Sequence, residues 1–265
     1  MATGDWIIRT YKAGRIGEKV KFWVAGNPKR RSERRERQTA KKLAQNVGGV
    51  IKKSARLLNE NFAGRDCVLL GMDYSDYGLM LLIEKIKKRG IDWDALDVDG
   101  RRDALLEAAG RELNNVLARV NYELKKKGER LKYYGVTADL DGQTGKPVRV
   151  HHHLVVPAGY EELFTHKWSK YGTVDWETIS KRQEDLLPIA VYLCEQVRHR
   201  DNAKMYIRSR NLAEPKVTDR VVYTGAELKP PRRARVLQRS EYKSPYHAQY
   251  LRYSVDVDTG GRRDL

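Results

Sequence analysis

Cysteine is scarce in this chain of 265 residues, which contains only Cys67 and Cys194. Each lies in an apolar context, so the pair indicates buried thiols in a reducing compartment rather than a disulfide framework. The sequence has no apolar run of 18 residues, and its first residues lack the long apolar core of a signal peptide. We therefore expect a protein that does not enter a membrane and that works in the cytoplasm.

Also missing is the glycine-rich loop, followed by Lys and Ser or Thr, that binds nucleotide phosphates, which argues against a fused helicase or ATPase. Positive charge, in contrast, is in excess: 52 Lys and Arg residues stand against 35 Asp and Glu, a formal net charge of +17. A field of this sign favours a nucleic acid as the partner. An anionic membrane surface and a merely solvated basic surface are the alternatives. The 40% of apolar residues, with 15 tyrosines, are enough to fill a core.

The N-terminal region, residues 1–60, is expected to hold a short hairpin followed by a basic helical segment. Residues 29–42 contain eight Lys or Arg against two Glu and no helix breaker. We predict a helix that breaks at Gly48-Gly49 and continues through Leu58. The density of charge favours an arm that follows DNA phosphates, although such a run can also be a solvated face. The candidate contacts on this arm are Arg30, Arg31, Arg34 and Arg35.

The central region, residues 61–225, is predicted to fold as an α+β sandwich, in which helices flank a mainly antiparallel sheet. The predicted elements are a strand within 65–75, helices over 77–90 and 101–127, a hairpin over 131–157, a helix within 183–201, and mixed loop and strand beyond 206. A polar stretch separates the hairpin from the last helix. Residues 226–265 are basic and contain proline, and we expect them to form a flexible tail.

Three of the six histidines stand in consecutive positions within an otherwise apolar strand sequence. Side chains alternate across a strand, so His151 and His153 point to one face and His152 to the other. Two imidazoles placed in this way can bind one divalent ion, and a third ligand would complete the site. Asp139 or Asp141, at the end of the partner strand, could supply it, and Asp139 is preferred. The alternative is a histidine that fills a core position without binding a metal.

The stretch HHHLVVP resembles the signature of the HUH-superfamily single-strand DNA endonucleases, in which an apolar residue separates two histidines and further apolar residues follow. His152 departs from this signature because it fills the apolar position. Three further segments resemble, in order and spacing, the motifs of one branch, the replication-associated proteins related to filamentous-phage initiators. They are LLNENFAGRDCVLLGMDYS, LKYYGVTADLDGQTGKPVRVHHHLVV, and LPIAVYLCEQV with MYIRSRNLAEP. The resemblance covers residues 38–222.

The resemblance implies an RRM-like HUH fold, a divalent metal (Mg²⁺ or Mn²⁺) at the histidines, and Tyr192 as the nucleophile. Attack on a phosphodiester would give a 5′-phosphotyrosyl enzyme and a free 3′-hydroxyl that can prime synthesis. The implied role is to initiate rolling-circle replication of a plasmid or phage in a prokaryotic cell. Single-stranded DNA at an origin or hairpin is the implied substrate, and a host helicase and polymerase are the implied partners. Glu195 departs from the family, which commonly has a lysine three residues after the tyrosine.

Further candidates for DNA contacts are Trp168, by stacking on unpaired bases, and Arg198, Lys204, Arg208 and Arg210, which follow the tyrosine helix. Two alternatives to a replication initiator stay open. One is a relaxase or single-tyrosine transposase with the same chemistry. The other is a catalytically inactive nucleic-acid-binding protein on an RRM-like scaffold, which would stack bases on aromatic residues of its sheet. Metal dependence and a covalent DNA adduct would distinguish the enzymes from the binding protein.

Overall fold

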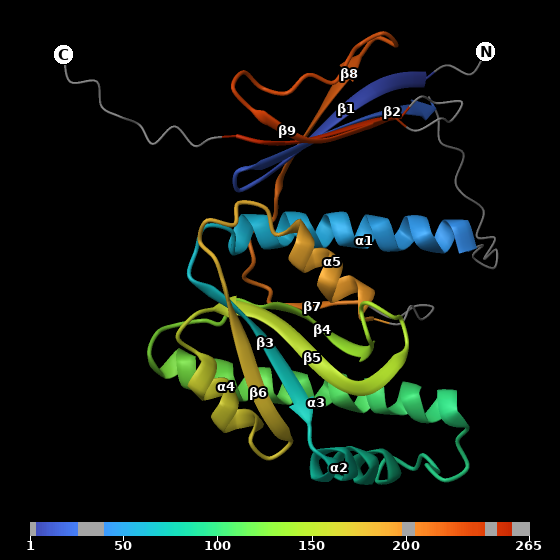
Figure 1. Ribbon diagram of the computed structural model, residues 1–265, viewed down its shortest axis with the longest axis vertical. Helices are drawn as coiled ribbons and strands as arrows, with labels where there is room; N and C mark the ends of the chain where they lie inside the picture. Colours follow the sequence, from blue (N-terminus) through green and yellow to red (C-terminus); the bar gives the residue numbers. More distant parts are fainter. Residues whose placement is uncertain (1–3, 26–39, 198–204, 242–247, 256–265) are drawn as a thin grey trace. The chain divides into compact units, whose positions relative to one another are not determined.

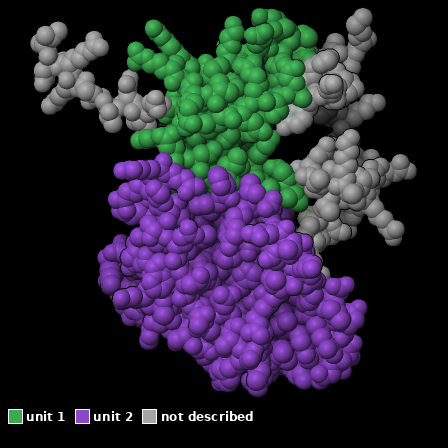
Figure 2. All heavy atoms as spheres, viewed as in Figure 1, with its two compact units in different colours: residues 1–63, 184–187, 213–265 green, residues 64–183, 188–212 purple. Residues whose placement is uncertain are grey.

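The computed structural model describes residues 4–25, 40–197, 205–241 and 248–255. The chain forms two compact units (Figure 2), and each unit is assembled from separate segments. The first unit comprises residues 1–63, 184–187 and 213–265, and the second comprises residues 64–183 and 188–212. The chain therefore passes from one unit to the other after residues 63, 183, 187 and 212. Among the described residues, no helix is long and apolar enough to span a membrane.

The first unit is built on a five-stranded antiparallel sheet in the order β8-β1-β2-β10-β9 (Figure 1). Its strands are β1 (Gly4–Ala13), β2 (Ile16–Ala25), β8 (Lys216–Val222), β9 (Arg235–Glu241) and β10 (Gln249–Ser254). The predicted N-terminal hairpin is confirmed as β1 and β2. Gly14 in its turn has a φ of 57°, a conformation that favours glycine.

The helix of the first unit, α1 (Ala40–Asn61), runs without interruption through Gly48 and Gly49, so the predicted break is wrong. Each glycine costs roughly 1 kcal/mol relative to alanine in a helix interior, a cost that tertiary packing can outweigh. The second half of α1 supplies such packing, because Leu57 and Leu58 are buried. The basic segment before this helix, residues 29–39, lies outside the described residues.

The region 226–265 contributes the strands β9 and β10 to this sheet, so the prediction of a flexible tail is wrong for both segments. In β10, Leu251 is fully buried, and so is its neighbour Arg252. The guanidinium of Arg252 forms ion pairs with Glu18 and Asp185. Burial of this paired cation explains why a basic sequence can form an inner strand of the sheet.

The second unit contains the other sheet, which is also antiparallel and five-stranded, in the order β6-β3-β5-β4-β7. Its strands are β3 (Cys67–Tyr74), β4 (Tyr134–Leu140), β5 (Pro147–Pro157), β6 (Gly172–Ile179) and β7 (Ile207–Arg208). The predicted strand within residues 65–75 and the predicted hairpin are confirmed as β3 and as β4 with β5. Strand β5, which carries the three histidines, is the central strand of this sheet.

Four helices accompany this sheet: α2 (Asp76–Lys87), α3 (Val98–Lys126), α4 (Glu161–Trp168) and α5 (Leu187–Glu195). Helices α3 and α4 lie along one face of the sheet, and α5 lies over the other (Figure 1). The core between the sheet and α3 includes Leu70, Met72, Leu154, Leu113, Val116 and Val120. Helices α2 and α3 were predicted, whereas α4 and β6 come from the polar stretch to which no element was assigned. The expected α+β class is confirmed, with two antiparallel sheets rather than one.

Candidate active site

The pairing of β5 fixes the direction of each histidine. His151 lies opposite Asp73 on β3, and His153 lies opposite Gly71. Residues that face each other across an antiparallel pair project to the same side of the sheet. His151 and His153 therefore share the face that α5 covers, and His152 points to the face covered by α3.

His152 is a core residue whose ring nitrogens both have partners. Its Nδ1 lies 3.0 Å from the hydroxyl of Thr137, and its Nε2 lies 3.1 Å from the hydroxyl of Tyr74. The ring also packs edge-on against Trp168, with 5.4 Å between ring centroids. Burial, together with the neighbouring His151 and His153, lowers the pKa of His152 to about 3. A neutral imidazole thus takes the apolar position of the motif, because two buried hydroxyls provide its hydrogen bonds.

His151 and His153 converge on a residue that the sequence did not point out, Gln196. The Nε2 atoms of both histidines lie 3.1 Å from its side-chain oxygen, Oε1. Their rings meet edge to face with 4.9 Å between centroids. Two ligands at right angles on an ion with bonds of about 2.1 Å are about 3.0 Å apart, which is close to these separations. Two imidazole nitrogens and one amide oxygen therefore fit a divalent metal ion.

The position of Gln196 is fixed by its backbone and by its side chain. Its carbonyl accepts hydrogen bonds from the backbone N–H groups of Asp139 (3.3 Å) and Leu140 (3.2 Å), where β4 has an irregularity. Its side-chain Nε2 donates to the carbonyl of Tyr192 (3.1 Å), which leaves Oε1 turned toward the histidines. A Cβ atom added at Gly142 would lie only 3.1 Å from its Cγ atom. Because the amide is buried and held by several contacts, its Oε1 atom has a fixed position, as a metal ligand requires.

Burial also determines the charge of His153. It lowers the pKa of His153 to about 4, and the adjacent His151 contributes in the same direction. Gln196, Asp73 and Asp175 act in the opposite direction and only partly offset this effect. At neutral pH the ring is therefore uncharged, which is the form that binds metal ions.

Tyr192 lies beside this cluster, as the sequence analysis proposed. Its hydroxyl is 3.5 Å from Nε2 of His153, and the two rings are 5.2 Å apart in an edge-to-face arrangement. The helix α5 buries Leu193 and Cys194 and leaves Tyr192 45% exposed. An exposed phenol therefore lies next to the two histidines, where a molecule bound at this surface could reach it.

Asp139 does not join the histidines, so its prediction as the third ligand is wrong. Its carboxylate is buried and forms an ion pair of 2.7 Å with Arg102 of α3, on the other side of the sheet. Ala138, not Asp139, pairs with His151, so alternation places Asp139 on the opposite face, and the sequence did not reveal this register. Asp141 accepts hydrogen bonds within its own turn, mainly from the backbone N–H of Thr144, which lowers its pKa. Among the described residues, no three His, Cys, Asp or Glu side chains come together to hold a metal ion.

The residues predicted to contact DNA lie in different environments. Trp168 is fully buried, and its indole N–H donates to the carbonyl of Asp73, so it cannot stack on a base. Arg208 is half-buried at β7, and Arg210 is exposed two residues later, so their contact with DNA stays a prediction. The remaining candidates lie outside the described residues: Arg30, Arg31, Arg34, Arg35, Arg198 and Lys204.

Two carboxylates on the histidine face were also missed. Asp73 pairs with His151 in the sheet, and Asp175 on β6 lies opposite Gly71, which in turn lies opposite His153. A Cβ atom at Gly71 would come within 2.4 Å of a carboxylate oxygen of Asp175, so the carboxylate lies directly over Gly71, opposite His153. Both aspartates are exposed, and their negative charge would attract a cation toward the histidines.

The arrangement combines two imidazole nitrogens and an amide oxygen, spaced as ligands of one divalent cation, with an exposed tyrosine hydroxyl. Such a pair can transfer a phosphoryl group to the tyrosine oxygen. The sequence signal that could have revealed Gln196 is its spacing of four residues from Tyr192, one helical turn along the same face. Comparisons of the chain with protein-family models, curated proteins and solved structures give no match.

Proposed function

We propose that this protein is a single-strand DNA endonuclease and ligase of the HUH type, which initiates rolling-circle replication of a plasmid or phage. The observation that carries the proposal is the position of the Tyr192 hydroxyl, 3.5 Å from His153, whose Nε2 shares the oxygen of Gln196 with His151. The antiparallel sheet with the histidine strand at its centre and helices on its faces supports the expected RRM-like fold.

In this mechanism Tyr192 attacks the scissile phosphorus through its phenol oxygen. The bond from that oxygen to phosphorus forms and the bond from phosphorus to the 3′ oxygen breaks, while the phenol proton passes to solvent and the leaving 3′ oxygen takes a proton from solvent. The products are a tyrosine-linked 5′ end and a free 3′-hydroxyl. Reversal of the same exchange rejoins two ends, so one residue accounts for both nicking and ligation.

His151, His153 and Gln196 would hold the metal ion, Mg²⁺ or Mn²⁺. When bound, a divalent ion polarises the phosphate oxygens and stabilises charge on the leaving 3′ oxygen. The protein contributes a neutral His153 and a fixed amide oxygen before any ion arrives. Because carboxylate ligands are absent from this trio, the ion keeps most of its positive charge for the phosphate.

The substrate is single-stranded DNA at an origin or an extruded hairpin, because Tyr192 stands on an exposed surface that a flexible strand can reach. The net charge of +17 favours binding to the phosphate backbone. Strand separation would come from a host helicase and synthesis from a host polymerase.

The proposal is tested by incubating the protein with Mn²⁺ and labelled single-stranded oligonucleotides, followed by a denaturing gel. A covalent adduct that a chelator abolishes is expected for the unchanged protein and for Tyr122→Phe, a control at an exposed tyrosine of α3. The adduct should disappear in Tyr192→Phe. If all three proteins bind DNA and none forms an adduct, the proposal fails and the inactive binding scaffold takes its place.

The metal site has its own test, which does not depend on activity. Binding of Mn²⁺, followed by electron paramagnetic resonance, should weaken by at least about tenfold in His153→Ala and in Gln196→Ala. The control Asp139→Asn should retain Mn²⁺ affinity, since that carboxylate pairs with Arg102. Loss of binding in Asp139→Asn with none in Gln196→Ala would contradict the proposed ligand set.

A further inference from the structure

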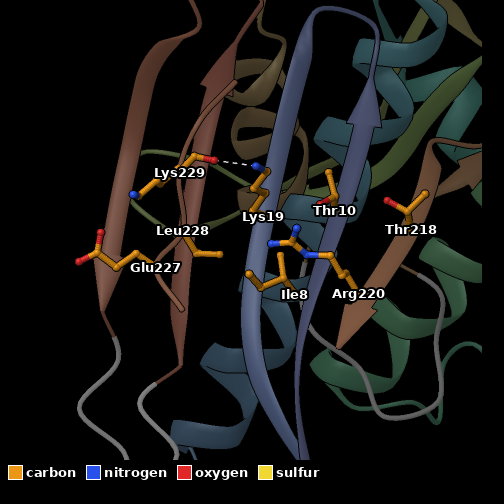
Figure 3. Close-up of a pocket in the computed structure, with 8 residues that line it drawn as sticks. All are labelled: Ile8, Thr10, Lys19, Thr218, Arg220, Glu227, Leu228 and Lys229. Atoms are coloured by element: carbon orange, nitrogen blue, oxygen red, sulfur yellow. Dashed lines mark hydrogen bonds between the residues drawn. The ribbon is translucent and has the colours of Figure 1, made fainter. Parts of the chain in front are cut away.

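A pocket of about 340 Å³ lies on the sheet of the first unit (Figure 3). Its lining includes Thr10, Lys19, Thr218, Arg220, Leu228 and Lys229. The nucleophile and the three metal-binding candidates all belong to the second unit, so the nicking mechanism does not use this pocket.

The register of the sheet brings the polar residues of the pocket together. Thr10 on β1 lies opposite Lys19 on β2 and opposite Thr218 on β8. Arg220 is two residues beyond Thr218 and lies opposite Ile8, so its side chain leaves the sheet on the same side. In Figure 3 the guanidinium of Arg220 extends across β1 toward Lys19. Two cationic groups and two hydroxyls thus line one hollow from three neighbouring strands.

Residues 227–229, in the connection from β8 to β9, line one side of the pocket, and two lysines hold this connection in place. Lys19 donates from its ammonium to the carbonyl of Lys229 (2.6 Å). Lys21, which is buried, donates to the carbonyls of Ala226 (2.7 Å) and Thr224. Because these acceptors are neutral backbone groups, the hydrogen bonds satisfy the lysines without cancelling their charge.

The pocket therefore has a positive charge that the described residues do not neutralise. Within those residues, none of Lys19, Lys21 and Arg220 forms an ion pair. The one carboxylate of the lining, Glu227, points away from Lys19 and Arg220 in Figure 3. Burial lowers the pKa of Lys19, and the charges of Arg220 and Lys12 lower it further. Such a concentration of like charge is stabilised when an anion binds between the groups.

We propose that this pocket binds a backbone phosphate of DNA and gives the first unit a DNA contact of its own. Arg220 and Lys19 would neutralise the phosphate, and the hydroxyls of Thr10 and Thr218 would donate hydrogen bonds to its oxygens. The apolar surface of Ile8 and Leu228 provides room for the attached sugar. A volume of about 340 Å³ exceeds that of a phosphate alone and suits a nucleotide unit.

The choice of DNA rests on the proposed function, whereas the preference for a phosphate rests on the pocket alone. Arg220 is exposed and forms no ion pair among the described residues, so its replacement should leave the fold intact. We would measure the affinity for labelled single-stranded and duplex DNA, across a range of salt, for Arg220→Gln and Arg220→Glu. The matched controls are Arg232→Gln and Arg232→Glu, at an exposed arginine of the same unit that does not line the pocket.

Arg220→Gln should lower DNA affinity by roughly three- to tenfold and reduce the slope of log affinity against log salt by about 1, while Arg220→Glu should have the larger effect. The DNA affinity of the Arg232 variants should stay within about twofold of that of the unchanged protein, because only the general loss of positive charge acts on it. Equal losses at both positions would overturn the proposal. The proposal would also be overturned if the Arg220 variants bound DNA normally but no longer bound phosphatidylglycerol vesicles. That result would assign the pocket to a lipid headgroup.

The covalent adduct assay on a short oligonucleotide separates this proposal from the nicking mechanism. If Arg220→Gln weakens DNA binding but still forms the adduct at saturating DNA, both proposals stand. If the unchanged protein forms no adduct and Arg220→Gln still weakens DNA binding selectively, the nicking mechanism fails and the phosphate pocket stands. If the unchanged protein forms the adduct and Arg220→Gln binds DNA as tightly as the unchanged protein, the nicking mechanism stands and the phosphate pocket is refuted.

Discussion

Lowering the pH from about 7.5 to about 5 should destabilise the second unit, and His152 should account for a defined part of the loss. The folded state holds this histidine at full burial between Tyr74 and Thr137, with its pKa near 3 against 6.5 for the free side chain. Folding therefore favours the neutral ring. The resulting stability is complete above pH 6.5, and it is lost progressively as the pH falls from 6.5 toward 3.

The expected size follows from the shift. One pH unit below the unfolded pKa corresponds to about 1.4 kcal/mol, so at about pH 5 the loss from His152 is about 2 kcal/mol. We would measure the free energy of unfolding in urea at both pH values for the unchanged protein and for His152→Gln. The amide of glutamine can still bond to the two hydroxyls, although we expect a penalty of about 1–3 kcal/mol near pH 7.5.

The free energy of unfolding should fall between about pH 7.5 and about pH 5 in both proteins. This fall should be smaller by about 2 kcal/mol in His152→Gln than in the unchanged protein. His166→Gln, at an exposed histidine near the end of α4, is the control and should behave like the unchanged protein. The reasoning is refuted if His152→Gln shows the full loss of stability at low pH. Nuclear magnetic resonance of the His152 ring gives a direct check, because its protons should not titrate above about pH 4.

Three further changes test other features. Gly142→Val should displace Gln196 and weaken Mn²⁺ binding by roughly tenfold in a titration, without unfolding the protein. Arg252→Ala should destabilise the first unit by about 2–4 kcal/mol, because it removes a buried guanidinium that pairs with Glu18 and Asp185, while Arg56 still pairs with Glu18. Urea unfolding followed by circular dichroism would measure this loss, and a value below about 1 kcal/mol would contradict it. Leu113→Ala should cost about 2–5 kcal/mol in the second unit, and an unchanged thermal midpoint would show that α3 is not part of its core.

The sequence predicted the parts of the fold whose signals are local. The spacing of apolar residues indicated α3, turn residues indicated the hairpin of β4 and β5, and alternation placed His151 and His153 on one face. Strand β6 escaped notice although its residues 174–177 alternate between apolar and acidic, because this run is short and lies within a mostly polar stretch. Strand β10 escaped because its central Arg252 is buried only through partners far away in the sequence.

In the candidate site, too, only the residues with a local sequence signal were predictable. Tyr192 and the two histidines came from a recognisable pattern, and they lie together in the structure. The position of Asp139 was not predictable, because the sequence does not give the register of the hairpin: Ala138 pairs with His151, so alternation turns Asp139 to the other side of the sheet. Gln196, the third ligand that we propose, reaches the histidines because the end of α5 hydrogen-bonds to the backbone of β4, a contact that no local sequence pattern predicts.

The way the two units share the chain bears on how the protein emerges from the ribosome. All residues of the second unit have been synthesised once position 212 is reached, so this unit can begin to fold while synthesis continues. The sheet of the first unit has to wait much longer, because β10, the neighbour of β2, ends at Ser254. Until then the edge of β2 presents unpaired backbone groups, to which another nascent chain could attach. Slow translation of the last strands would therefore favour aggregation of the first unit while leaving the second unit folded.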